Sequence, residues 1–290
     1  MPTGITTMGK VKIYTPEDYR KHGHLNDIRE LYKKLSEYST LIKWLVRVGL
    51  TQQYKRSFVG VAWLFIAPAF SILLWVLLEA SGMLNPGETE IPYVAYVFLS
   101  NAIWTLFIGF YKNISETYIG RGGELLQNNF PHIIVVVEKI IITLINFLIP
   151  LLLSLAVLLL FKVQISWSAL LFPFAILPLI FLGTGLGLIF SVLKIVAMDL
   201  STVFDTSLEF LKYVTPIVFA TTVNSGILQT IMKYNPLTYL VSFPRAVLLN
   251  QAIPDLNLFV ICSIGSLLFL IFSYRFFTIS SPVVFEKITL

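Results

Sequence analysis

The feature that most constrains this chain is a series of long apolar runs without a charged residue. One extends from Phe58 to Leu78 and another from Val163 to Leu193. A helix needs about 20 apolar residues to cross the hydrocarbon core of a bilayer, and each run is long enough. The composition agrees, because only 13% of residues are charged, against roughly 25% in an ordinary soluble domain. We therefore predict an all-α integral membrane protein.

The apolar runs predict about six membrane-spanning helices. We place them at residues 58–78, 91–111, 133–161, 169–193, 200–219 and 256–274. The predicted organisation is an N-terminal arm (1–25), an amphipathic interface helix (26–57), a transmembrane domain (58–277) and a tail (278–290). The link between the first two spans carries Asn85-Pro86-Gly87 and no Lys or Arg, which indicates an external loop.

The basic residues predict the orientation of the chain. Eleven of the 21 Lys and Arg precede Phe58. With about six spans, 16 basic residues lie on the inner side, Lys139 and Lys212 lie within spans, and only Lys162, Lys233 and Arg245 lie outside. This bias indicates that both termini are cytoplasmic. The formal charge of +5 does not indicate nucleic acid, because the basic residues form no groove or patch.

The segment before the first span has the pattern of an amphipathic helix. Asp27 and Glu30 resemble a capping box, and apolar residues then recur every three or four positions from Ile28 to Leu45. Lysines and arginines fall largely off this stripe, as expected of a helix on an anionic inner leaflet. A soluble helical hairpin is the alternative.

Residues 221–255 are interrupted too often to form two crossings. Asn224-Ser225-Gly226, Asn235-Pro236, Pro244 and Pro254 leave two apolar pieces, each shorter than a bilayer. We predict two short re-entrant or interfacial helices. Irregular backbone at that depth is tolerated only where protein or a water-filled cavity satisfies its polar groups, so the segment is expected beside the mouth of a pathway.

Charged residues in the fifth predicted span need an explanation. Asp205, Glu209 and Lys212 are spaced four and three apart and share one helical face. Because that face should avoid lipid, the charges either line a pathway or subunit seam, or form an interfacial cluster in which Glu209 and Lys212 pair.

The aromatic residues allow two interpretations. Tryptophans near span ends are usually interface anchors, whereas flat rings also stack on sugar faces. The aromatic run Trp104, Phe107, Phe110 and Tyr111 is the best candidate for the second role.

No site for catalysis, metal or nucleotide is evident. Residues 4–11 approach a phosphate-binding loop, but Val11 stands where Ser or Thr would hold magnesium. The three histidines have no partner set, and Cys262 is the only cysteine, so it can form no intrachain disulfide. We expect a transport subunit with no cofactor of its own; if ATP drives it, another chain binds the nucleotide and Mg²⁺.

The order of several motifs resembles the permease subunits of ABC exporters for O-antigen, capsule and teichoic-acid polymers. These motifs are Gln53–Trp63 with Pro68, Trp104–Phe107, Glu124–Pro131, Met198–Leu200, Thr215–Val218, Asn235–Tyr239 and Arg245. The chain departs from the family pattern at Arg47–Leu50, at His132 and in its longer N-terminal arm.

The resemblance implies a homodimer in the cytoplasmic (inner) membrane that works with two ATP-binding subunits and exports a lipid-linked glycan. It implies that the loop 115–132 couples to the ATPase, beside the amphipathic helix, and that segment 221–255 forms an external gate. The implied coupling residues are Glu124, Leu125, Leu126, Asn128, Asn129, Phe130 and Pro131. The implied gate residues are Pro216, Asn235, Pro236, Tyr239 and Arg245. The candidate channel residues are Trp63, Trp104, Phe107, Phe110 and Tyr111.

Three other function classes fit the sequence less well. A function as an ABC permease for a drug or free lipid would not account for the motifs that resemble polysaccharide exporters. A secondary transporter needs ion-coupling residues in several spans, but only the fifth carries carboxylates deep in the run. A membrane-embedded transferase should show a His or acidic pair at an interface, and none stands out.

Overall fold

A computed structural model describes residues 33–55, 62–119, 131–224, 226–249, 251 and 255–289. Within these ranges the chain is helical and contains no strand. The helices are α2 (Ser39–Lys55), α3 (Trp63–Ala80), α4 (Tyr93–Ser115), α6 (Ile133–Leu160), η3 (Trp167–Leu171), α7 (Phe172–Ala175), α8 (Leu177–Val196), α9 (Met198–Leu211), α10 (Gly226–Tyr234), α11 (Pro236–Leu249) and α12 (Leu256–Thr289).

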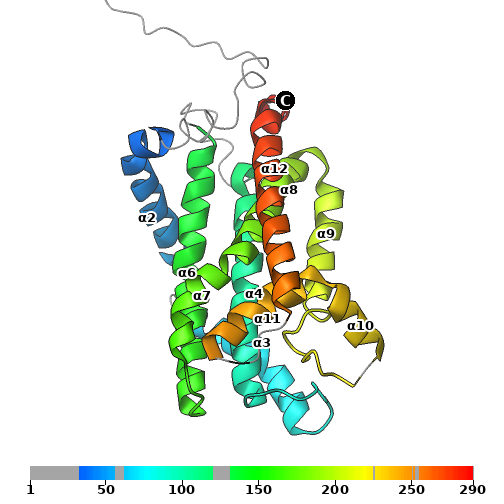
Figure 1. Ribbon diagram of the computed structural model, residues 1–290. Coiled ribbons are helices and arrows are strands. Elements are labelled where there is room, and N and C mark those ends of the chain that lie inside the picture. Colours follow the sequence, from blue (N-terminus) through cyan, green and yellow to red (C-terminus); the bar gives the residue numbers. More distant parts are fainter. Residues whose placement is uncertain are drawn as a thin grey trace, which may run out of the picture.

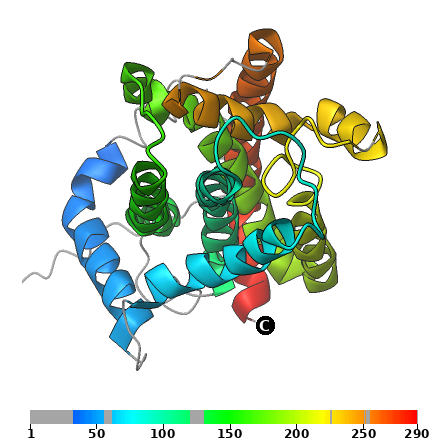
Figure 2. The same cartoon turned by 90° about the horizontal axis from the view of Figure 1, so that it is seen from below.

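Four stretches of the described chain are long and apolar enough to cross a membrane. They are Tyr93–Ser115, Ile133–Leu160, Trp167–Val196 and Leu256–Ser281. Figure 1 shows α4, α6, α8 and α12 running along a common direction. Viewed along this direction, α3 and α11 lie across the bundle (Figure 2). The predicted first span is therefore helical, but α3 does not run parallel to the four long helices.

The centre of the bundle is α8, which packs between α4 and α12. Small residues permit this close packing. A Cβ atom added at Gly183 would lie 2.9 Å from the carbonyl oxygen of Phe107, and one at Gly187 would lie 2.7 Å from Cβ of Ile114. On another face of α8, a Cβ at Gly185 would lie 2.8 Å from the ring of Phe269 in α12. The glycines thus bring two different helices against α8.

Two helix ends differ from the sequence prediction. The predicted fifth span extends to residue 219, but α9 ends at Leu211 and turns follow. Pro216 prevents the helix from reaching residue 219, because proline cannot continue a helix and restricts the residue before it. At the other end of the chain, the predicted tail from residue 278 is not separate, since α12 continues without a break to Thr289.

The amphipathic helix before the first span is described from residue 33. In α2, Ile42 and Leu45 are buried against α6, whereas Lys43, Trp44 and Arg47 are exposed. The arm 1–25, the proposed capping box and the coupling residues from Glu124 to Phe130 lie outside the described residues. Pro131 is described and directly precedes the first turn of α6.

Candidate functional site

The irregular segment 212–223 between α9 and α10 is held by side chains rather than by helical hydrogen bonds. The Tyr93 hydroxyl donates to the carbonyl oxygen of Val218 at 3.1 Å, and that of Tyr96 lies 3.0 Å from the carbonyl oxygen of Pro216. Both tyrosines belong to α4. Backbone carbonyls away from water need such partners, since each unsatisfied group is costly. The α4 tyrosines therefore make a non-helical segment stable inside the protein.

Arg245 of α11 is the strongest single tie to this segment. Its Nη1 donates to Ser100 Oγ at 2.8 Å and to the carbonyl oxygen of Pro216 at 2.9 Å. The guanidinium group also lies over the Tyr96 ring, 4.3 Å from the ring centre. The side chain is only 8% exposed. A buried cation is costly unless polar groups surround it, and here a hydroxyl, a carbonyl and an aromatic face do so.

Asn235 joins the segment to the start of α11. Its Oδ1 accepts a hydrogen bond from the backbone N–H of Leu237 at 3.0 Å, as an N-cap does. Its Nδ2 donates to the carbonyl oxygen of Val214 and to Thr215 Oγ1, both at 3.0 Å. One amide therefore fixes the first turn of α11 and segment 212–223 together.

The structure brings together three of the five predicted gate residues. Arg245 and Asn235 converge on the stretch around Pro216, as described above. Pro236 is the first residue of α11, a place that suits proline. The Tyr239 hydroxyl donates to the carbonyl oxygen of Lys233 at 2.7 Å and so ties α11 to α10.

The sequence analysis missed the α4 side of this cluster. Tyr93, Tyr96 and Ser100 recur at spacings of three and four, and all three are buried. A polar stripe on one face of an apolar span was the signal that could have revealed them. Gly87 was also missed: its φ is +89°, and a Cβ there would lie 2.7 Å from the backbone nitrogen of Val223.

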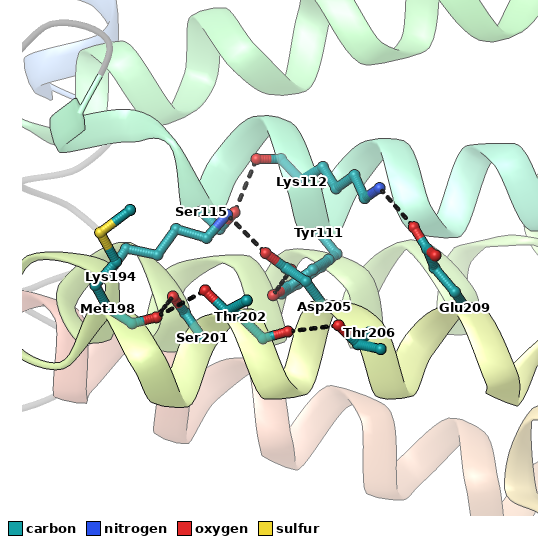
Figure 3. A network of polar contacts seen from close by, with 10 residues as sticks. All are labelled: Tyr111, Lys112, Ser115, Lys194, Met198, Ser201, Thr202, Asp205, Thr206 and Glu209. Carbon is teal, nitrogen blue, oxygen red and sulfur yellow. Dashed lines mark hydrogen bonds and ion pairs between the residues drawn. The ribbon is translucent and has the colours of Figure 1, made fainter.

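The three charged residues singled out in the predicted fifth span each find a partner on another helix. Asp205 accepts a hydrogen bond from the Tyr111 hydroxyl and pairs with Lys194 Nζ at 3.5 Å. Figure 3 shows this network between α4, α8 and α9. Glu209 lies 4.0 Å from Lys112 Nζ, and Lys212 Nζ donates to Asn101 Oδ1 at 2.8 Å. The alternative of a simple Glu209–Lys212 pair is therefore not what the structure shows.

The exposed face of α9 carries polar residues that no other part of the protomer covers. Thr202, Thr206 and Glu209 are spaced four and three apart, and all are exposed. The Glu209 side chain is 74% exposed and that of Lys112 beside it 47%. We call Thr202, Thr206, Glu209 and Lys112 the polar stripe. The hydroxyls of Thr202 and Thr206 donate to carbonyl oxygens of α9 itself, so the stripe offers their oxygens as acceptors, together with one ion pair, to whatever covers this face.

The predicted role of the α4 aromatic run is not supported by its burial. Phe107, Phe110 and Tyr111 are fully buried, and Trp104 is 5% exposed. The Tyr111 ring packs edge-on against Phe190 of α8 and Phe204 of α9. A ring enclosed in its own protomer has no face to offer a sugar. The remaining channel candidate, Trp63 at the start of α3, is 51% exposed.

We predict that the α9 charges differ in their effect on stability. Asp205→Ala is expected to lower the free energy of unfolding by about 2 kcal/mol, because it leaves the buried Tyr111 hydroxyl and Lys194 without their partner. Glu209→Ala should cost less than about 1 kcal/mol, because its ion pair is exposed. Equilibrium unfolding of the two variants in detergent micelles measures the difference. Equal losses would contradict the distinction.

No group of His, Cys, Asp and Glu within the described ranges is placed to hold a metal ion.

No family model matches the chain. The chain is similar to the O-antigen export system permease protein RfbA of Myxococcus xanthus, with 25% identity over 232 residues. This match covers 79% of the chain and 86% of the relative. It confirms the resemblance to ABC exporter permeases that the sequence motifs indicated.

Proposed function

We propose that this protein is the permease subunit of an ATP-driven exporter that moves lipid-linked polysaccharide across the cytoplasmic membrane. In this proposal two copies of the chain form the pathway, and two separate ATP-binding subunits hold ATP and Mg²⁺. Both termini are cytoplasmic. The similarity to an O-antigen export permease and the four helices long enough to cross a bilayer support this function.

The observation that carries the proposal is the polar stripe on α9. A helix face with an exposed ion pair and two threonines is poorly suited to lipid, where intramembrane charges face a bundle interior or a water-filled cavity. The neighbouring residues Val203 and Phe210 are 64% and 69% exposed, so apolar contact area lies beside the stripe. A second copy packed on this side would cover these apolar residues and enclose the hydroxyls, which suit a sugar chain.

The cluster around Pro216 supports the proposed external gate. Helices α10 and α11 are 9 and 14 residues long, too short to cross a membrane, which takes about 20 residues. They are joined to α4 through Arg245 and to segment 212–223 through Asn235. A gate built this way has a defined closed state, because directional hydrogen bonds hold its irregular backbone.

The remaining parts follow the same proposal. The proposed fifth crossing joins α9, which has 14 residues, to the segment that follows it, and α3 is the proposed first crossing at an angle to the four long helices. Trp63 is the aromatic residue left to meet the sugar. The coupling residues from Glu124 to Pro131 dock on the ATP-binding subunit, beside α2. The basic exposed side of α2, with Lys43 and Arg47, suits the anionic inner leaflet.

A bulky residue in the polar stripe tests the proposed pathway. Thr206→Trp is expected to reduce glycan export on the order of tenfold, because passage through a pore depends on its free diameter. Cells that lack the native gene and carry the variant with its ATP-binding partner are assayed for surface glycan, with membrane yield measured in parallel. Ile261→Trp is the matched control, since Ile261 is 63% exposed on α12 and outside the proposed pathway.

Normal export by Thr206→Trp, at normal yield, would contradict the pathway.

A second measurement tests whether ATP is hydrolysed on a separate subunit. The purified chain alone should not hydrolyse ATP, whereas the complex with its ATP-binding partner should. Hydrolysis by the chain alone would refute a separate ATPase.

A further inference from the structure

Tyr118 is a buried junction between three parts of the chain at the end of the bundle opposite the gate. It lies just after α4, it is 1% exposed, and its hydroxyl is 2.8 Å from Ser281 Oγ in α12. The same hydroxyl is 3.2 Å from Nδ1 of His132, the residue before α6. The Tyr118 ring stacks on Phe277 with ring centres 5.6 Å apart. One side chain thus joins the ends of α4, α6 and α12.

The donor in each hydrogen bond of this junction can be assigned by counting protons. Ser281 Oγ lies 2.7 Å from the carbonyl oxygen of Phe277, to which it donates. Because Ser281 has a single hydroxyl proton, Tyr118 then donates to Ser281 Oγ, and His132 Nδ1–H donates to the Tyr118 oxygen. This assignment, made from the donors and acceptors, uses each proton once and keeps all three bonds.

The protonation state of His132 agrees with this order. Burial lowers the pKa of His132 to about 4, so the imidazole is neutral at the pH of the cytoplasm. Burial also raises the pKa of Tyr118 above its usual value, so its hydroxyl keeps its proton. A chain of neutral hydrogen bonds inside protein is directional, and its members polarise one another.

The location of the junction gives it a consequence for transport. Tyr118 and His132 stand on either side of residues 119–131, which contain the proposed coupling residues. Helix α12 packs along α8, where the ring of Phe269 lies against Gly185. Apolar contacts are non-directional and by themselves resist small sliding movements little. A hydroxyl bonded to Ser281 resists such sliding. Tyr118, before the segment, is fixed to α12 directly, and His132, after it, is fixed to α12 through Tyr118.

We propose that Tyr118 is a positioning residue that ties both ends of segment 119–131 to α12, so that movement imposed on this segment by the ATP-binding partner is transmitted to the last membrane helix. This inference rests on the proposed function. It adds a route of transmission through the C-terminal helix, which neither the coupling residues nor the gate cluster supplies.

The test is Tyr118→Phe in the complete complex, because phenylalanine keeps the stack on Phe277 and removes only the hydroxyl. In proteoliposomes loaded with lipid-linked glycan, ATP hydrolysis should stay within about twofold of wild type, while glycan exported per ATP falls about tenfold, a factor equivalent to 1.4 kcal/mol of coupling. Ser281→Ala, which keeps Tyr118, should have the same effect. The double variant should be no worse than either single one, since both remove the same bond.

The matched control is Thr278→Val, which removes a hydroxyl of α12 that bonds to the carbonyl oxygen of Tyr274 in the same helix. Its export per ATP should equal that of wild type. An unchanged ratio in Tyr118→Phe and Ser281→Ala would overturn the inference and leave the proposed function intact. Loss of complex assembly in both variants would also overturn it, because the hydroxyl would then support binding rather than transmission. Wild-type complexes that hydrolyse ATP without exporting glycan would overturn the proposed function and, with it, this inference.

Discussion

Arg245→Ala is expected to lower the free energy of unfolding by about 3 kcal/mol, because it removes charge-assisted hydrogen bonds to buried groups. The Ser100 hydroxyl loses its donor, and the Pro216 carbonyl keeps only the hydrogen bond from Tyr96. The Tyr96 ring loses the cation above it. Since these contacts hold segment 212–223 against α4, the gate should also lose its closed arrangement. Equilibrium unfolding in detergent micelles measures the first effect, and leakage of a small solute through proteoliposomes measures the second.

One further variant at Arg245 separates the effect of geometry from that of charge, and a variant at Lys233 serves as its control. Arg245→Lys keeps the charge but not the planar fork, so it should recover only part of the lost stability. Lys233→Ala is the control, because Lys233 is an exposed basic residue on neighbouring α10 and its loss should change little. Full stability in Arg245→Ala would show that the carbonyl of Pro216 does not depend on this side chain.

Gly187→Leu is expected to prevent normal packing of α8 against α4 and to cost about 3 kcal/mol or more. Even a Cβ at Gly187 would lie 2.7 Å from Cβ of Ile114 and 3.1 Å from the carbonyl oxygen of Phe110. Neither atom can move easily, since one is backbone and the other is the branch point of a stiff side chain. The measurement is the yield of monodisperse protein on gel filtration, followed by thermal unfolding.

Other glycines give a graded series for comparison. Gly185→Leu should cost less than Gly187→Leu, because the nearest atoms belong to the Phe269 ring, which can turn aside. Gly265→Leu on α12 should be neutral or slightly stabilising, because no atom lies within 4 Å of its added Cβ and leucine is a better helix former. An equal loss at all three positions would show that leucine itself, rather than close helix packing, causes the damage.

The contacts around Pro216, which we call the gate cluster, and the contact between α4 and α8 have different consequences for how the protein could move. The gate cluster places a buried arginine and an asparagine on a segment without regular structure, so its arrangement depends on a few directional bonds. The α4–α8 contact depends on close backbone approach at Gly183 and Gly187, which leaves no room for rearrangement. We therefore expect α4 and α8 to behave as a rigid frame, against which segment 212–223 and α10 change position.

Much of the architecture could be predicted from the amino-acid sequence. The apolar runs predicted the four long helices because the cost of transferring a helix into a bilayer is close to a sum over its residues. The break at Asn235-Pro236 predicted that two short helices meet there, since proline and asparagine act locally on the backbone. Pro244, also expected as a break, lies inside α11, which continues to Leu249. The three gate residues that meet at Pro216 were also named from motifs.

The sequence alone could not decide which way the side chains of a span face. Lipid and protein interior are equally apolar, so hydropathy cannot distinguish a ring that faces a pathway from one in the core. For this reason the sequence did not anticipate that Phe107, Phe110 and Tyr111 are buried in the protomer, and of the polar stripe it indicated only Glu209. Partners such as Asn101 for Lys212 and Tyr96 for Arg245 also depend on contacts between residues more than a hundred positions apart. Only the packing of the helices determines these contacts, because it sets which faces meet.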